Sequence, residues 1–243
     1  MSSNRIAWLS ADDPPDAFPP VDTALSEPDG LLAAGGDLSS ERLLTAYRHG
    51  IFPWYDQGQP LLWWSPEARC VFRPGDFHLS RRLRRSLKQS TAEVRINTDF
   101  GAVIRACAAP RGAEHGTWIT TEMMIAYERL QREGWAHSIE VWQQDSLLGG
   151  LYGLAIGRAF FGESMFSGAT DASKIALLAL SRMMEMDALD ILDCQLVSRH
   201  LMSLGATIIP RDEFVTSLDS LCSPPIPIEN WPNAPISVPE LLL

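Results

Sequence analysis

The sequence predicts a mixed α+β fold, and two observations carry this prediction. Three apolar segments of strand-like character, residues 138–142, 147–156 and 159–166, follow one another and are separated by polar turns. A helix expected from Asp171 to Met186 then leads into a fourth short apolar run at residues 191–194. Consecutive strands followed by a helix and a further strand are typical of a mixed α+β layer.

Residues 1–65 are expected to form a small N-terminal domain. Its first part, residues 9–30, is rich in Pro, Asp and Ser and is predicted to be irregular. A Gly-Gly turn and a serine cap then predict a helix over residues 41–49, which ends at Gly50. Two aromatic segments broken by proline complete this part of the chain, at residues 51–55 and 61–66.

Residues 66–222 are expected to form a second, larger domain. Besides the elements already described, capping residues and hydrophobic periodicity predict a strand at residues 93–97 and helices at residues 79–88, 99–108, 121–134, 198–204 and 212–221. Residues 109–117 are expected to be a loop. The last segment, residues 223–243, is rich in proline and is expected to be a loosely ordered tail.

Composition excludes several classes of protein. The chain is 46% hydrophobic and 21% charged, as is ordinary for a soluble globular protein. No apolar run reaches the roughly 18 residues of a membrane span, and no signal-peptide core follows the N-terminus, so a cytoplasmic protein is expected. The four cysteines and five histidines lack metal-ligand spacing, so no metal site is expected and the thiols are expected to be reduced.

Charge is unevenly distributed along the chain. The formal net charge is −10, but the segment from Arg69 to Arg111 holds ten of the 20 Lys and Arg residues against three acidic residues. This segment therefore carries +7 and the remainder carries −17. A basic patch on an acidic body can bind a polyanion, while the acidic remainder favours a cationic second substrate.

The predicted helix at residues 79–88 concentrates this positive charge. Leu79, Leu83 and Leu87 follow at intervals of four and form one apolar stripe, which leaves the cationic residues Arg81, Arg82, Arg84, Arg85 and Lys88 facing water. A solvated helix face is the plain interpretation. We favour phosphate binding, because five cations in eight residues repel one another unless an anion relieves them.

Four tryptophans lie beside polar turns rather than within long apolar runs: Trp54, Trp63, Trp64 and Trp118. Aromatic side chains next to a basic patch can stack on unpaired bases. For any single tryptophan a place in the core or at a domain interface is the commoner outcome, and both interpretations remain open.

Polar side chains interrupt two apolar strands of the predicted sheet. Glu163 lies in the run Phe160-Phe161-Gly162-Glu163-Ser164, and Asp193 and Gln195 lie at the end of the next strand. Because Asp193 and Gln195 are two positions apart, a continued strand would point both to one face. A carboxylate and an amide there can orient an amine and polarise a carbonyl, which suits acyl transfer, but a buried structural pair is equally compatible.

Ordered motifs along residues 20–215 closely resemble the leucyl/phenylalanyl-tRNA–protein transferases. These motifs are GLLAAGGDL at residues 30–38, GIFPW at 50–54, WWSP at 63–66, GTWI at 116–119, HSIEVW at 137–142, GGLYG at 149–153, GESMFS at 162–167, ASK at 172–174 and DCQ at 193–195. One departure follows the last motif, where Ser198-Arg199-His200 replaces a stretch that often carries Asn in the family.

The resemblance implies a fold and a reaction. Such enzymes have a small α/β N-terminal domain and a catalytic domain similar to the GNAT acyltransferase fold. They transfer Leu or Phe from aminoacyl-tRNA to the N-terminal Arg or Lys of a protein, and the product becomes a substrate of a Clp-type protease. The resemblance implies no cofactor and no metal, and we expect a monomer.

The resemblance also implies roles for individual residues. Trp54 and Trp118 match positions that hold the terminal adenosine of the tRNA. Asp193 and Gln195 match a constellation that guides proton loss from the attacking amine, with Glu163 orienting Gln195. Positions implied to lie at the apolar aminoacyl pocket are Leu151, Phe160 and Ser164.

Two other classes of protein remain as alternatives. A GNAT-type acetyltransferase would bind acetyl-CoA, although the sequence lacks the Gly-rich loop that such enzymes use for the pantetheine phosphate. A non-catalytic RNA-binding module would bind tRNA regardless of its aminoacylation and would tolerate loss of Asp193.

Overall fold

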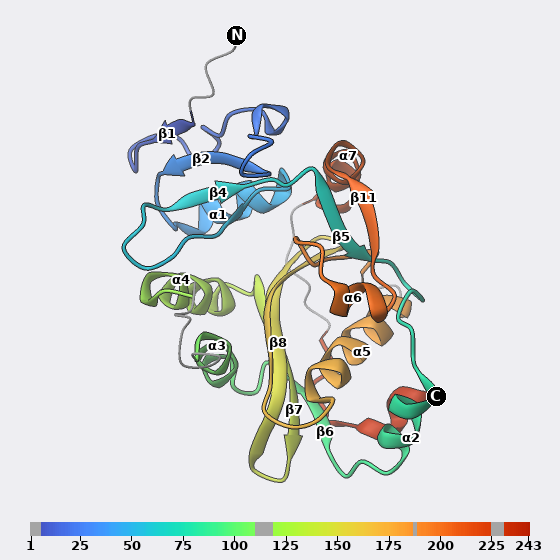
Figure 1. Ribbon diagram of the computed structural model, residues 1–243. Helices are drawn as coiled ribbons and strands as arrows, with labels where there is room; N and C mark the ends of the chain where they lie inside the picture. Colours follow the sequence, from blue (N-terminus) through green and yellow to red (C-terminus); the bar gives the residue numbers. More distant parts are fainter. Residues whose placement is uncertain (1–5, 110–118, 187–188, 225–230) are drawn as a thin grey trace.

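The computed structural model describes residues 6–109, 119–186, 189–224 and 231–243. Two β-sheets are formed by these residues, a small one near the N-terminus and a larger one with helices on both sides (Figure 1). This architecture confirms the predicted mixed α+β class. The narrower GNAT-like assignment stays a prediction.

The small sheet has four strands in the order β1-β2-β4-β3, of which β1 and β2 are parallel. The strands are Ala7–Leu9 (β1), Leu31–Gly35 (β2), Phe52–Pro53 (β3) and Leu62–Trp64 (β4), and the short 3-10 helix η1 spans Val21–Thr23. Helix α1 (Ser40–Arg48) starts where the Ser39 hydroxyl accepts the Arg42 N–H. It ends before Gly50, whose φ of 72° is in the left-handed region that favours glycine. The predicted helix at residues 41–49 is therefore confirmed.

The large sheet has eight strands within the described residues, in the order β11-β5-β10-β9-β8-β7-β6-β12. Their bounds are Ala68–Phe72 (β5), Glu93–Ile96 (β6), Ala136–Gln143 (β7), Ser146–Ile156 (β8), Ala159–Ser167 (β9), Ile191–Asp193 (β10), Thr207–Pro210 (β11) and Ile236–Ser237 (β12). Strands β9 and β10 are parallel and the other pairs are antiparallel. Strands β7 to β10 confirm the four strands that opened the sequence prediction.

The pairing of β8 with β9 contains a bulge: Tyr152 faces Ser164 and Gly153 faces Gly162, which leaves Glu163 as the extra residue of β9. A Cβ atom on Gly153 would lie 2.2 Å from the carbonyl oxygen of Phe161 on the neighbouring strand. Glycine therefore allows the close approach of two strands here.

Helices cover both sides of the large sheet (Figure 1). One side carries α3 (Phe100–Ala108) and α4 (Thr121–Arg132), and the other carries α5 (Ala172–Glu185) and α6 (Arg199–Ser203). Helices α2 (Arg81–Lys88) and α7 (Arg211–Leu221) lie towards the two ends of the sheet. Among the described residues, none of these helices has both the length and the apolar character that crossing a membrane requires.

Two hydrophobic cores hold these layers together. The first unites the small sheet and α1 with α3, α4 and one face of the large sheet, through residues such as Tyr47, Trp63, Tyr127 and Phe161. The second lies on the other face, between the sheet and α5. Because the first core spans both sheets, the N-terminal part of the chain is packed directly against the larger part.

Helix starts differ from the predictions in detail. The cap of α4 is Thr120, whose Oγ accepts the Met123 N–H, and not Thr121. Helix α2 starts after the Ser80 cap, so Leu79 lies before the helix while Leu83 and Leu87 are buried as predicted. Asp171 precedes α5 without capping it, because its carboxylate accepts from Lys174 Nζ at 2.6 Å.

The C-terminal segment is more ordered than its proline content suggested. Strand β12 pairs with β6, and the 3-10 helix η2 (Val238–Leu242) packs against α2 and α5. Trp231, Val238 and Leu241 are buried. The expectation of a loose tail is therefore wrong for residues 231–243, because apolar side chains between the prolines add to the second core.

Candidate active site

The candidate site lies where strands β9 and β10 separate. The two strands pair only from Ala159 to Phe161 on β9 and from Ile191 to Asp193 on β10. Strand β9 then continues to Ser167 without β10 beside it, and the chain after Asp193 turns away. Glu163 and Gln195 face each other across this opening, and Gln195 Nε2 donates to Glu163 Oε1 at 2.7 Å.

Glu163 is the centre of a buried hydrogen-bond network. Its Oε1 also accepts from the Tyr47 hydroxyl at 2.6 Å, and its Oε2 accepts from the Tyr127 hydroxyl at 2.7 Å. The two tyrosine hydroxyls contact each other as well. Tyr47 lies on α1 and Tyr127 on α4, so side chains from three separate elements hold this carboxylate.

Burial dominates the electrostatics of this network. It raises the pKa of Glu163 from its ordinary 4.5 to about 7, although hydrogen bonds from Tyr47, Tyr127 and Gln195 act in the opposite direction. Burial and the neighbouring Glu163 charge also raise the pKa of Tyr47 and Tyr127 well above 10, so both phenols remain hydrogen-bond donors. Glu163 is thus poised to change its charge near neutral pH.

Asp193 is fully buried and ion-paired. Arg69 Nε donates to Asp193 Oδ1 at 2.9 Å, and Arg69 Nη2 donates to Oδ2 at 2.6 Å. The guanidinium also donates to the Gly50 carbonyl and lies over the rings of Phe52 and Phe214. Both oxygens of Asp193 are therefore engaged by a cation that is itself buried.

Asp193 and Gln195 do not share a strand face, which corrects the sequence argument. Strand β10 ends at Asp193, and Gln195 has a φ of 61° in the left-handed region. This turn allows the Gln195 backbone N–H to donate to Asp193 Oδ1 at 2.8 Å. Asp193 and Gln195 are close together because of this turn, and the Asp193 carboxylate holds the Gln195 backbone in place by this hydrogen bond.

A cavity of about 170 Å³ adjoins this network. Two predicted pocket residues, Leu151 and Ser164, line it together with Glu163. The remaining lining is mostly apolar and comes from residues Tyr152, Gly162, Met165, Leu177, Leu192, Cys194 and Leu201. Phe160 is fully buried below the lining, with its ring packed against Trp231. The cavity is the size and character expected for one apolar side chain.

Of the two predicted adenosine-binding tryptophans, the structure describes only Trp54. Trp54 directly follows β3 and is 38% exposed, with its ring centroid 5.5 Å from that of Trp64. Trp64 Nε1 donates to the Trp54 carbonyl at 2.6 Å, which holds this aromatic pair in place. Trp118 lies outside the described residues.

The basic helix α2 presents its predicted cations to solvent. The side chains of Arg81, Arg82, Arg84, Arg85 and Lys88 are exposed, and none of them forms an ion pair with another residue in the described part of the chain. A cavity of about 380 Å³ beside this helix is lined by Arg82 and Lys174.

Cavities that share lining residues lie between this helix and the candidate site. Met165 lines both the 170 Å³ cavity and a neighbouring one of about 430 Å³. Ser167 and Ser173 line both this second cavity and the one beside α2. These three cavities therefore neighbour one another between Glu163 and Arg82.

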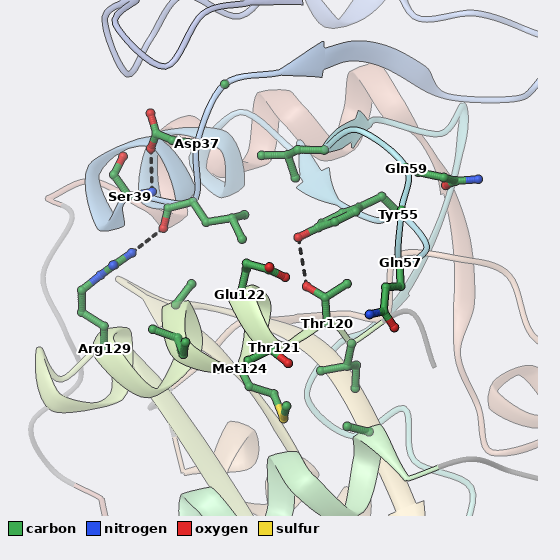
Figure 2. A pocket seen from close by; sticks show the side chains of 18 residues that line it. Asp37, Ser39, Tyr55, Gln57, Gln59, Thr120, Thr121, Glu122, Met124 and Arg129 are labelled. Carbon is green, nitrogen blue, oxygen red and sulfur yellow. Dashed lines mark hydrogen bonds between the residues drawn. The ribbon is translucent and has the colours of Figure 1, made fainter. Parts of the chain in front are cut away.

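A larger cavity, of about 960 Å³, lies elsewhere, between α4 and the loop from Tyr55 to Leu61 (Figure 2). The Tyr55 hydroxyl and the Thr120 hydroxyl bridge it at 3.1 Å, and Arg129 donates to the Leu38 carbonyl on its far side. None of the predicted site residues within the described part of the chain lines this cavity. We therefore place the candidate chemistry in the smaller cavity, which contains the perturbed carboxylate.

Sequence reasoning missed Arg69, Tyr47 and Tyr127. Arg69 did carry a usable signal, because it interrupts the apolar run of residues 68–72 much as Asp193 ends its own strand. The two tyrosines carried none, since an aromatic residue on an amphipathic helix is ordinarily core. No group of three or more potential metal-binding side chains occurs among the residues that the structure describes.

Comparison with known proteins identifies the family. The profile of the leucyl/phenylalanyl-tRNA protein transferase N-terminal domain matches residues 36–67, and the profile of the leucyl/phenylalanyl-tRNA protein transferases matches residues 71–219. This similarity makes the chain an aminoacyltransferase. It belongs to the leucyl/phenylalanyl-tRNA–protein transferase family.

Relatives with this name are similar over most of the chain. The protein from Pseudomonas aeruginosa strain PAO1 is 56% identical over 88% of this chain and 93% of its own length. The protein from Nitrosomonas europaea is 52% identical over 93% of this chain and 94% of its own. Among solved structures, a functionally unknown conserved protein from Staphylococcus epidermidis aligns over 74% of this chain and 68% of its own, with 9% identity and a TM-score of 0.38. That likeness is too low to assign a fold.

Proposed function

We propose that this enzyme transfers Leu or Phe from aminoacyl-tRNA to the N-terminal Arg or Lys of acceptor proteins. The observation that carries the proposal is the Gln195 amide, which donates to Glu163 through Nε2 at the edge of an apolar cavity. With Nε2 committed in this way, the Gln195 carbonyl oxygen is the atom left to accept an N–H from an incoming amine.

In the proposed reaction the leucyl or phenylalanyl side chain occupies the cavity lined by Leu151 and Ser164. The acceptor amine attacks the ester carbonyl, the C–N bond forms and the C–O bond to the ribose breaks. One amine proton ends on the released ribose hydroxyl. Because the ester is already activated, orientation of the amine by Gln195 can supply much of the rate enhancement.

Glu163 and Asp193 act as positioning residues in this proposal. Glu163 fixes which end of the Gln195 amide faces the amine. Asp193 accepts the Gln195 backbone N–H and is neutralised by Arg69. An aspartate with both oxygens bound in this way is poorly suited to remove a proton from substrate, so we assign it no role as a general base.

The basic helix α2 and the adjoining cavities support a route for the tRNA. Phosphates would contact Arg81, Arg82, Arg84, Arg85 and Lys88, and the 3′ end would follow these cavities from Arg82 to Glu163. Trp54 is exposed and held by Trp64, which suits stacking on the terminal adenosine. We propose the same role for Trp118 from the family resemblance alone.

The acceptor specificity is supported by charge. Outside residues 69–111 the chain carries −17, which favours acceptors with a cationic first residue. In this proposal the product, with Leu or Phe at its new N-terminus, is degraded by a Clp-type protease in the cytoplasm. We also propose that residues 1–65 and 66–222 act as a small N-terminal and a catalytic domain, and that the enzyme is a monomer.

A transfer assay tests the proposal. Purified protein is incubated with Leu-tRNA carrying labelled Leu and with a peptide that starts with Arg. A peptide of the same sequence with an acetylated N-terminus is the control. Label should appear on the first peptide and not on the second. Absence of transfer from both Leu-tRNA and Phe-tRNA would reject the function, and binding of acetyl-CoA in a calorimetric titration would favour the acetyltransferase alternative.

A further inference from the structure

Two cysteines face each other across strands β5 and β10, next to the candidate site. The ladder pairs Leu192 with Phe72 and Asp193 with Val71. Just beyond it, the Cys194 N–H donates to the Cys70 carbonyl at 2.8 Å and the Cys70 N–H donates to the Gln195 carbonyl at 3.4 Å, so Cys194 lies beside Cys70. Facing residues of neighbouring antiparallel strands have Cα atoms about 4.5–5.5 Å apart. A disulfide requires roughly 4.4–6.8 Å, so this pair has suitable backbone geometry.

The two thiols also interact through their side chains. Each is hydrogen-bonded to the other, which lowers the pKa of Cys70 and raises the pKa of Cys194. A thiol that stabilises a neighbouring thiolate is the arrangement in which one sulfur is primed to react and the other can resolve the product. Cys222, by contrast, is buried and its pKa is raised to about 12, mainly by burial.

A small reagent can reach this pair through the substrate cavity. Cys194 lines the 170 Å³ cavity and is partly exposed, whereas Cys70 is fully buried behind it. Cys194 also lies between Asp193, which is held by Arg69, and Gln195, which is held by Glu163. A covalent bond at Cys194 would therefore pull on the turn that positions Gln195.

We propose that Cys70 and Cys194 form a reversible disulfide that inactivates the enzyme when a hydroperoxide enters the substrate cavity. The Cys194 sulfur, which lines the cavity, attacks one oxygen of hydrogen peroxide while its proton passes to the Cys70 thiolate; the O–O bond breaks, and the hydroxide that leaves takes up a proton. The Cys70 sulfur then attacks the sulfenic sulfur of Cys194, the S–O bond breaks, and the hydroxide leaves as water with the Cys70 proton. The two thiols are oxidised and the peroxide is reduced to water.

The effect on activity rests on the proposed transferase function, because the disulfide would displace Gln195. A displacement of about 1 Å at a positioning group can lower turnover by about a hundredfold. We expect peroxide to lower transfer of Leu by at least about tenfold, and a dithiol reductant to restore it.

The test has a chemical and a functional arm. Purified protein is treated with hydrogen peroxide, remaining thiols are alkylated after denaturation, and peptides are analysed by mass spectrometry. The proposal predicts a linked pair of peptides containing Cys70 and Cys194. Two separate alkylated peptides, or Cys194 oxidised without a link to Cys70, would overturn it. This arm needs no activity, so it stands even if no tRNA substrate is found.

Variants complete the test. Cys70→Ala should transfer Leu at about the wild-type rate and keep that rate after peroxide. Cys70→Val serves the same purpose if the alanine variant folds poorly. Cys222→Ala is the matched control and should lose activity to peroxide as the wild type does. Equal loss of activity in Cys70→Ala and wild type would overturn the proposal.

Discussion

Gln195 donates its side-chain N–H to Glu163 across 2.7 Å, although the two residues are 32 positions apart. The contact is possible because β9 continues beyond its pairing with β10 and the chain turns at Gln195, whose side chain then reaches Glu163. Tyr47 and Tyr127 also donate to this carboxylate, Tyr47 to the same oxygen as Gln195 and Tyr127 to the other. The orientation of one amide thus depends on packing between both sheets.

The tyrosine hydroxyls should set the pH at which the enzyme works. Tyr127→Phe removes a donor that lowers the pKa of Glu163, so this pKa should rise further. The ionised form is the one that accepts the Gln195 amide, and the half-maximal pH of Leu transfer should shift upward by about one unit. A pH–rate profile measures the shift.

Tyr55→Phe provides the control for this variant. It removes the hydroxyl of another buried tyrosine, which is bonded to Thr120 and not to the network. Its half-maximal pH should equal that of the wild type. An identical profile for Tyr127→Phe and Tyr55→Phe would mean that Tyr127 contributes packing alone.

Stability should also depend on pH through Glu163. Its pKa is about 7 in the folded protein against an ordinary 4.5, so in between the folded state retains a proton that the unfolded chain releases. The stabilising contribution is therefore fully present below pH 4.5 and is lost as the pH rises through about 7. The shift corresponds to about 3 kcal/mol.

Urea unfolding from about pH 5 to about pH 8 measures this dependence. Glu163→Gln cannot titrate at this position and serves as the reference. The free energy of unfolding of the wild type should fall relative to that of the variant as the pH rises. A constant difference between the two proteins would contradict the buried, titrating carboxylate.

Replacing only one partner of the ion pair between Arg69 and Asp193 should strongly lower the free energy of unfolding. Arg69→Met leaves a buried carboxylate without its partner, and the expected loss is about 3–5 kcal/mol in the free energy of unfolding. The double variant Arg69→Met with Asp193→Leu should recover most of this loss, because it buries no charge. Equal stability of the single variant and the wild type would mean that the pair is open to water.

The basic helix should determine the salt dependence of tRNA binding. Arg82→Glu with Arg85→Glu should weaken binding and flatten the dependence of the dissociation constant on salt, because fewer counterions are released. Arg48→Glu with Arg132→Glu makes the same change of net charge at exposed positions elsewhere. If both double variants show the same salt dependence of tRNA binding, α2 is a solvated surface without a specific role in binding tRNA.

The sequence predicted the strands well where their pattern was local. Polar turns bound β7, β8 and β9, and alternation within each segment was sufficient. The prediction failed for strands whose pairing strands lie far away in the sequence. Strand β5 is five residues long and is stabilised by β10 and β11, which lie about 120 or more positions later.

The candidate site shows the same division. Glu163 and Asp193 were identified because a carboxylate in an apolar run needs a partner. The partners of Glu163, Tyr47 and Tyr127, were not identified, because they belong to helices whose packing on β9 has no signature in the sequence. The prediction that Gln195 shares a strand face with Asp193 was wrong because it continued the strand two residues beyond Asp193, where β10 ends.

The most direct measurement is single-turnover transfer of Leu from saturating Leu-tRNA to a peptide with N-terminal Arg, comparing wild type with Gln195→Ala. The account predicts that the variant binds Leu-tRNA as tightly as the wild type and transfers Leu about a hundredfold or more slowly. Near-normal transfer by Gln195→Ala would contradict the role of this amide in orienting the attacking amine.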